Sequence, residues 1–450
     1  MKSIVLLYCI FIATFAAIMH SPGHVSMDTS VQLYEAYIGE SISFNPPIMS
    51  ALLKLMGGGE LATAIFTSIC IFLTYGSFSL IVQSSGEKIT FTKLVLTIFV
   101  ISNPIIFSFL GSVWKDVIFS SLIIWFIALN FYSIFSKKIL ISFLSITLLP
   151  LIMFIRQQGI FIAPFLLLIP IYLSINHNFY KKYKITVISI LIITFGISTY
   201  AVDSISANLI KPNGTTYSLG LRNIFLYDII GSAYYSGDNL YIGSNELNLT
   251  SDQINKFKKA YSPVSIDFID HNQGYSWAEN FTNEKLFKIW IYFICKYPFS
   301  YLKHKVSVFS SSLGYTYNSD LTRPTFTIGI QGNPQYLAVL NINQGNSLRS
   351  MYIYQYLRPL YNYFIFTHFF WMLISILSIV VVNKSRLIDS NKFFSNITFL
   401  TISLIYLMNF FTNLSWDYRY LYPIIPLTSI LFLIMFYGQN KTIDTHLKNE

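Results

Sequence analysis

Charged residues are scarce in this chain of 450 residues. Only 11% of its residues are Asp, Glu, Lys or Arg, whereas about 25% is usual in a soluble globular domain. Hydrophobic residues instead make up 54% of the chain, and apolar runs long enough to cross about 30 Å of hydrocarbon recur along it. The composition excludes an ordinary soluble domain and predicts an integral membrane protein.

Cysteine is also scarce, with only Cys9, Cys70 and Cys295. The first two lie inside expected spans and the third has no plausible external partner, which excludes a disulfide framework. The seven histidines are scattered, and none has a Cys or a second His at a ligand spacing. We therefore predict no metal cluster, although Asp28 and Asp116 leave metal dependence open.

The fold expected from these runs is an all-α polytopic membrane protein of about ten transmembrane helices. A large mixed periplasmic segment separates the seventh helix from the eighth. We interpret the first run as a signal anchor, because Ala16 to His20 is a poor cleavage site. The expected spans are residues 3–20, 60–83, 91–111, 117–134, 139–155, 160–176, 185–203, 361–382, 394–412 and 421–437.

Positive residues set the expected orientation, since Lys and Arg beside short loops stay in the cytoplasm. Threading the ten spans alternately puts both termini and most loop lysines on that side. Lysines contacting anionic lipid then account for much of the net charge of +10, with no nucleic-acid partner. The expected parts are 1–203, a transmembrane module with an external loop at 21–58; 204–360, a periplasmic domain; and 361–450, a second transmembrane module.

The external turns of this topology carry an unusual set of charged residues. An arginine that breaks an apolar hairpin, as Arg156 does, is costly unless it binds something, and an acid in the first external loop indicates chemistry or ion handling. Arginine suits phosphate in particular, because its guanidinium offers forked donors. An interfacial ion pair at 115–116 and an arginine at 156 snorkelling to the headgroups are the alternative interpretations. The candidates are Asp28, Lys115, Asp116, Arg156 and Arg419, with His24 close to the first of them in the sequence.

Several short motifs resemble the GT-C superfamily of membrane glycosyltransferases, which use polyprenyl-phosphate-linked sugars. They are Asp28 in the first external loop with Gln32 and Gly39 after it, Pro46-Pro47 before the second span, and the turn Arg419-Tyr420-Leu421-Tyr422-Pro423. Asn45 stands where family members often have a histidine. Within the superfamily, the size and the lack of a soluble C-terminal domain are similar to bacterial and prophage enzymes that decorate O-antigen with glucose.

The resemblance implies a hexosyltransferase in the bacterial inner membrane that modifies an O-antigen or lipopolysaccharide-type glycan, with either inversion or retention. Its donor would be a lipid-linked sugar, with no further cofactor, and its partners membrane lipid and the acceptor glycan. Asp28 would be the catalytic base and Asp116 a second acid or the partner of its neighbour; Lys115, Arg156 and Arg419 would bind the donor phosphate; His24, Gln32, Tyr420 and Tyr422 would bind substrate.

The segment 204–360 is rich in tyrosine and tryptophan, a composition that suits stacking on sugar rings or contact with a bilayer. Apolar and basic residues alternate between Glu284 and Gly314, which predicts two amphipathic helices resting on the outer leaflet. If residues 286–312 crossed the membrane instead, the topology after them would invert.

Two other functions are compatible with the sequence. A transporter or flippase of lipid-linked sugars would also have about ten spans, but it would tend to show internal repeats and polar mid-membrane positions. We find neither in this chain. An O-antigen-type polymerase also joins lipid-linked sugars and has a large late external loop, and the sequence does not distinguish it from a transferase.

Overall fold

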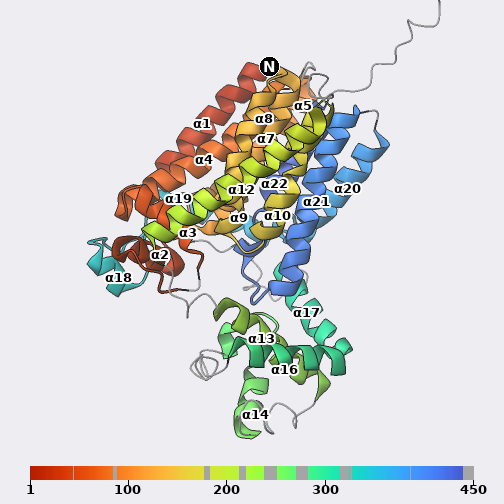
Figure 1. Cartoon of the computed structure of the whole chain (residues 1–450). Coiled ribbons are helices and arrows are strands. Elements are labelled where there is room, and N and C mark those ends of the chain that lie inside the picture. The colour runs from red at the N-terminus through yellow and green to blue at the C-terminus, as the bar shows by residue number, and fades with distance from the viewer. Residues whose placement is uncertain are drawn as a thin grey trace, which may run out of the picture.

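The computed structural model describes residues 1–43, 45–84, 89–176, 183–211, 219–237, 251–269, 282–314, 324, 327–385 and 387–438. Within these ranges the chain is helical and has no strand, only five isolated β-bridges. The long helices lie side by side in one bundle, and a smaller group of helices projects from one end of it (Figure 1). The predicted all-α class is confirmed.

Seven of the described helical segments are long and apolar enough to cross a membrane. They account for seven of the ten expected spans, and a break at Asn103-Pro104 divides one of them into α5 and α6. Their helices are α1 (Lys2–His20), α4 (Gly59–Ser84), α5 (Phe91–Ile101) with α6 (Pro104–Leu110), α7 (Lys115–Ser136), α12 (Lys184–Leu209), α21 (Asp389–Thr412) and α22 (Ile424–Tyr437). The chain is therefore a multi-pass membrane protein.

The other three expected spans coincide with shorter apolar segments. Two are interrupted: α8 (Ile139–Ser145) passes through a 3-10 turn into α9 (Leu149–Ile155), and α10 (Gly159–Leu166) is followed by α11 (Leu168–Asn176). The expected start at residue 361 is wrong, because residues 360–366 form two 3-10 turns. The helix α20 (His368–Lys384) begins only where the Thr367 hydroxyl accepts a hydrogen bond from the backbone N–H of Phe370.

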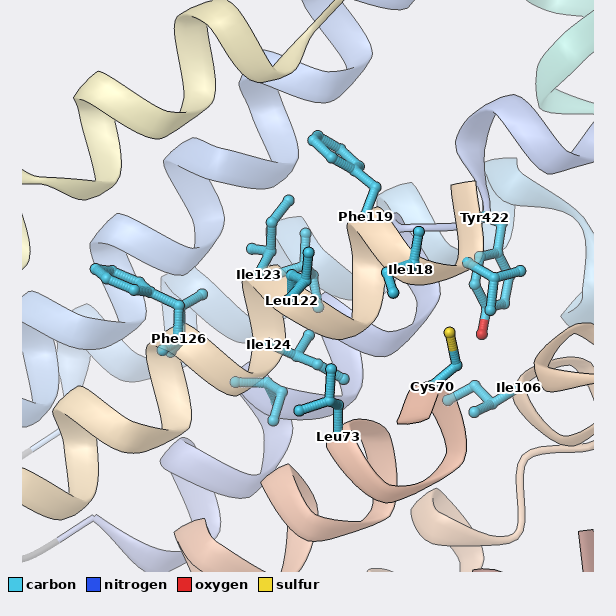
Figure 2. Close-up of a cluster of buried hydrophobic side chains, with 14 of the residues drawn as sticks. Cys70, Leu73, Ile106, Ile118, Phe119, Leu122, Ile123, Ile124, Phe126 and Tyr422 are labelled. Carbon is cyan, nitrogen blue, oxygen red and sulfur yellow. The ribbon is translucent and has the colours of Figure 1, made fainter. Parts of the chain in front are cut away.

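The core of the bundle forms around α7, which packs against α4 and α22. Figure 2 shows side chains of α7, among them Ile118 and Leu122, facing Cys70 and Leu73 of α4 and the ring of Tyr422. Lipid tails are as apolar as leucine, so close packing and hydrogen bonds hold such helices together. The hydroxyls of Thr74 and Ser121 make one of these bonds between α4 and α7, at 2.9 Å.

Short helices gather at the end of the bundle opposite the N-terminus (Figure 1). Two of them, α2 (Met27–Ile38) and α3 (Pro47–Leu55), lie between α1 and α4 in the sequence. Two more, α18 (Pro334–Val339) and α19 (Leu348–Leu357), contact α2 and α1 respectively. The predicted external segment 204–360 therefore contributes its last part to the bundle end.

Four other described helices of that segment form a small unit that projects from the bundle (Figure 1), and we call this unit the outer domain. It contains α13 (Leu219–Ser236), α14 (Ser251–Ala260), α16 (Asn283–Lys296) and α17 (Pro298–Leu313). These helices share a hydrophobic core of their own, which includes Tyr227, Phe257 and Phe293. The two helices expected between Glu284 and Gly314 are confirmed as α16 and α17.

A charged group lies inside the outer domain, and we call it the closed cluster: Asp228, His304 and Lys305. All three are at most 1% exposed, and the Asp228 carboxylate accepts from Lys305 Nζ at 2.5 Å, His304 Nε2 at 3.1 Å and Trp290 Nε1 at 2.9 Å. Lys305 Nζ also donates to the backbone oxygen of Phe411 at the end of α21, at 2.7 Å. This last bond joins the outer domain to the bundle.

Candidate functional site

Four separate segments bring charged side chains together at the bundle end. Asp28 lies in the first turn of α2, which starts where the Ser26 hydroxyl accepts a hydrogen bond from the Thr29 N–H. The other segments are the start of α7, the residue that ends α9, and the 3-10 turn before α22. We call the resulting group the cavity cluster: Asp28, Lys115, Asp116, Arg156, Asp417 and Arg419.

Arg419 forms ion pairs with two carboxylates. Its Nη1 lies 2.6 Å from Asp28 Oδ2, and its Nε lies 2.6 Å from Asp417 Oδ2. The Asp417 side chain also accepts from the Arg419 backbone N–H, so it caps the 3-10 turn that carries the arginine. The guanidinium lies over the ring of Trp114, with its carbon 5.4 Å from the ring centre. These contacts fix Arg419 against the first turn of α2.

The Asp28 carboxylate is ionised at neutral pH. Burial raises its pKa, but the positive charges of Arg419 and Lys115 outweigh that effect and keep the pKa below its ordinary value of 3.8. The side chain is nevertheless 34% exposed. Asp28 is thus a charged carboxylate that a ligand can reach.

Arg156 forms an ion pair that is more deeply buried than those of Arg419. Its Nη1 lies 2.8 Å from Asp116 Oδ1, and the two side chains are 6% and 1% exposed. The same nitrogen donates to the backbone oxygen of Tyr420 at 3.2 Å, and the guanidinium lies near the rings of Phe119 and Tyr420. Such a pair ties the end of α9 to the start of α7.

Lys115 differs from the two arginines in its partner. Its Nζ donates to a neutral acceptor, the side-chain oxygen of Asn45, at 2.7 Å. Both arginines have carboxylate partners within 2.8 Å. Asp116 and Asp28 also attract the Lys115 charge, but burial outweighs them and holds the pKa of Lys115 below its ordinary value of 10.5. Lys115 therefore lacks the direct carboxylate contact that each arginine has.

A cavity open to solvent, with about 680 Å³ of empty space, lies beside these groups. Lys115 and Arg156 supply its cationic wall, and amide and hydroxyl side chains supply much of the rest. The side-chain oxygen of Asn409 is buried there, and no described residue donates a hydrogen bond to it. The lining residues are Pro46, Lys115, Arg156, Gln157, Gln158, Gly220, Ile224, Asn409, Thr412, Asn413, Leu414 and Tyr420. Such a lining suits an anionic group attached to a polyhydroxylated one.

The structure brings together all five charged residues expected from the sequence, and Tyr420 lies with them. It places the other three candidates elsewhere. Tyr422 is buried in the bundle core and stacks on Phe109 with ring centres 4.7 Å apart. Gln32 is buried on α2 and is 2% exposed. Neither lines the cavity.

His24 is also buried, 1% exposed, and its ring joins loops instead of lining the cavity. Its Nδ1 accepts from the Gly329 N–H at 2.9 Å, so the proton resides on Nε2, which lies 3.0 Å from His20 Nδ1. Burial lowers the pKa of His24 to about 3, so the ring is neutral. Gly111 is needed beside it, because a Cβ there would collide with both imidazoles.

The expected stacking surface of the outer domain is only partly described. Tyr227 and Tyr261 lie in its interior, whereas Tyr234 is 48% exposed. Tyr235, Trp290 and Tyr301 are partly buried. Six further aromatic candidates of the segment lie outside the described residues: Tyr217, Tyr241, Tyr275, Trp277, Tyr315 and Tyr317. In the ranges that the structure covers, no three His, Cys, Asp or Glu residues group as metal ligands would.

Comparison of the chain with family models, with curated proteins and with solved structures finds no match. The site is therefore interpreted from its own geometry. Sequence reasoning missed Asp417 in the cavity cluster and the buried Glu35 near it, and it named Asn45 without giving it a role. The sequence carries a signal for each of the missed residues. Asp417 stands two residues before Arg419. Glu35 lies seven residues after Asp28, two helical turns away on the same face.

Proposed function

We propose that the protein is a GT-C type glycosyltransferase that moves a sugar from a polyprenyl-phosphate donor to a surface glycan at the periplasmic face of a bacterial inner membrane. One observation carries the proposal. A partly exposed, ionised carboxylate, Asp28, belongs to the same charged cluster as two cations that line a solvent-open cavity. The helix α2 that carries Asp28 lies at one end of a bundle of apolar helices (Figure 1).

The chemistry needs a base and a place for a leaving phosphate. A hydroxyl oxygen of the acceptor attacks the anomeric carbon of the donor sugar, while Asp28 takes the hydroxyl proton. The bond between that carbon and the phosphate oxygen breaks, and the phosphate leaves with the electron pair. Lys115 and Arg156 would stabilise the charge that develops on the phosphate. The polar wall around Asn409 would accept hydrogen bonds from the sugar hydroxyls.

The arrangement supports Lys115 as the first phosphate ligand. Arg156 and Arg419 are already neutralised by Asp116, Asp28 and Asp417. Their more direct role would be to shape the cavity and to keep Asp28 charged. This assignment makes Lys115 the cation whose loss should weaken donor binding most.

The proposed topology has ten spans with both termini in the cytoplasm. It counts the three shorter apolar segments as spans, which leaves the cavity cluster and the outer domain on the periplasmic side. The gathering of charge at one end of the bundle favours surface chemistry over transport, because a transporter would place its polar groups near mid-membrane.

The test is the mass of the surface glycan released from cells that carry the wild type, Asp28→Asn, or the control Glu284→Gln, at equal membrane abundance. Glu284 forms an exposed ion pair with Lys288 on α16 and takes no part in the cavity. We expect a hexose-sized gain per repeat unit with the wild type and the control, and none with Asp28→Asn. A change in chain length at constant repeat mass would point to a polymerase. No change with any variant would contradict both and favour a transporter.

A further inference from the structure

The helix that carries Asp28 carries a second carboxylate on the same face. Glu35 follows it by seven residues, or about two turns, and it is fully buried. Its Oε1 accepts from the backbone N–H groups of Ile42 at 2.9 Å and Ser43 at 2.8 Å, and its Oε2 accepts from the Ser50 hydroxyl at 2.6 Å. A buried carboxylate is costly unless it is well hydrogen-bonded, and these donors supply the bonds. Glu35 thus holds the loop between α2 and α3 from the inside.

Asn45 in that loop contacts Lys115, which lines the cavity. The backbone N–H and the side-chain Nδ2 of Asn45 both point to the Ser43 hydroxyl oxygen, at 3.2 and 3.3 Å. The amide oxygen is left to face Lys115 Nζ at 2.7 Å. Lys115 has only donors, so it meets the amide oxygen, and the contacts with Ser43 hold the rest of the Asn45 amide in place.

A continuous set of hydrogen bonds runs from Glu35 through Ser43 and Asn45 to Lys115. Because its last acceptor is a neutral amide, it orients the ammonium without neutralising it. A carboxylate in the place of Asn45 would orient the lysine equally well but would compete with an incoming anion. Lys115 is also the cation on the cavity wall that has no carboxylate within ion-pair distance among the described contacts.

We propose that Glu35 is a positioning residue that directs Lys115 into the cavity and so sets the affinity of the site for an anionic phosphate group. The position of the lysine follows from the contacts alone, whereas the identity of the ligand as a lipid phosphate rests on the proposed function. Glu35 itself touches no ligand.

The first measurement concerns position and needs no ligand. The rate at which an amine reagent modifies Lys115 is followed by mass spectrometry of the purified full-length protein at fixed pH. We expect Glu35→Ala and Asn45→Ala each to raise this rate several-fold, because both release the ammonium from its acceptor. Glu35→Gln should stay within two-fold of the wild type, since its amide oxygen can still accept from Ile42 and Ser43. Unchanged rates in both alanine variants would overturn the positioning role.

The second measurement concerns affinity and uses a short-chain polyprenyl phosphate in detergent as the probe. We expect Glu35→Ala to weaken binding about ten-fold, the scale of one hydrogen bond to a charged group. In a Lys115→Ala background the same change should have no further effect, because the two residues act through one contact. Equal losses in both backgrounds would show a merely structural role for Glu35 and overturn the inference.

The two measurements separate the two proposals. A wild-type protein that does not bind the probe, with Lys115 still released by Glu35→Ala, would contradict the proposed function and leave the positioning role intact. If Glu35→Ala does not fold, Ser43→Ala replaces it in both measurements, because it removes the hydroxyl that links the loop held by Glu35 to Asn45 while leaving the buried carboxylate and Asn45 in place.

Discussion

Two clusters of charged side chains, the cavity cluster and the closed cluster, differ in how completely their charges are enclosed. In the closed cluster every member is at most 1% exposed, and Asp228 is matched by a lysine, a histidine and an indole N–H. In the cavity cluster, Asp28 is 34% exposed and Lys115 has a neutral partner beside open space. Full burial with every charge directly paired indicates a structural group, whereas partial exposure and a cation that contacts no carboxylate directly indicate a binding site.

The largest expected effect is on transfer, at Asp28. Asp28→Asn keeps the size of the side chain and removes its basicity, so we expect transfer to fall by about 10²- to 10⁴-fold, the usual contribution of a general base. Initial rates with purified protein, donor and acceptor measure it. An unfolding midpoint within a few degrees of the wild type controls for folding. If transfer persisted at the wild-type rate, the cavity cluster would be structural and the contrast with the closed cluster would fail.

The next largest effect is on stability, at Asp228. Asp228→Ala leaves Lys305 buried without its carboxylate, and breaking a buried pair in this way costs about 3–5 kcal/mol. Denaturant unfolding of the detergent-solubilised protein, or limited proteolysis of the outer domain, measures the loss. Replacing both members of the pair, with Asp228→Leu and Lys305→Met, should recover much of it. A single variant as stable as the wild type would show that the closed cluster is not a structural pair.

The clusters should also differ in their response to acid. Burial lowers the pKa of His304 below its ordinary value of 6.5. Below pH 6.5 the histidine is therefore protonated in the unfolded chain but still neutral in the folded one. The free energy of unfolding falls as the pH drops below 6.5 for this reason. The pKa of Asp28 is also depressed, but its stabilisation is lost only as the pH falls below 3.8. We expect a loss of up to about 1.4 kcal/mol per pH unit from one such histidine between pH 6.5 and 5.

Unfolding free energies measured across this range test the difference. The glutamine of His304→Gln can still donate to Asp228 and accept from Tyr261. This variant should therefore fold, and its free energy of unfolding should depend less on pH than that of the wild type. If the unfolding free energy of His304→Gln changed with pH as much as that of the wild type, the acid sensitivity would come from another histidine. His24 is the next candidate, because burial also lowers its pKa.

The smallest effect is expected at an exposed pair. Glu284 and Lys288 lie four residues apart on α16, and their side chains are 78% and 70% exposed. Solvent screens such pairs, and many contribute nothing measurable. Glu284→Gln should change neither transfer nor the unfolding midpoint. A clear change in either would mean that exposure alone does not separate functional charges from incidental ones in this protein.

The sequence predicted the composition of the cavity cluster because alternate threading of apolar spans puts their external turns on one face. Asp28, Lys115, Asp116, Arg156 and Arg419 were expected together on that basis, and they lie together. Tyr422 shows the limit of such reasoning. A 3-10 turn at Tyr418–Leu421 comes just before Tyr422 and sets the direction in which its side chain points, which is into the core. Residue types alone do not predict that direction.

The closed cluster and Glu35 were not predicted, for a related reason. Asp228 stands in a run of apolar residues on α13. Its partners His304 and Lys305 come from α17, about 76 positions later in the chain, and Trp290 comes from α16. Only the packing of these helices brings them together. Glu35 resembles a solvent-facing residue of a short helix in the sequence, and its burial depends on the loop that folds back over it.

The cysteines, which form no disulfide, give the molecule its own marker of sidedness. Cys9 and Cys70 are buried in the bundle, whereas Cys295 is exposed on α16 of the outer domain. A membrane-impermeant maleimide should therefore react at one position of the unmodified chain, without cysteine engineering. Labelling of intact spheroplasts would place the outer domain in the periplasm, and labelling only of inverted vesicles would place it in the cytoplasm.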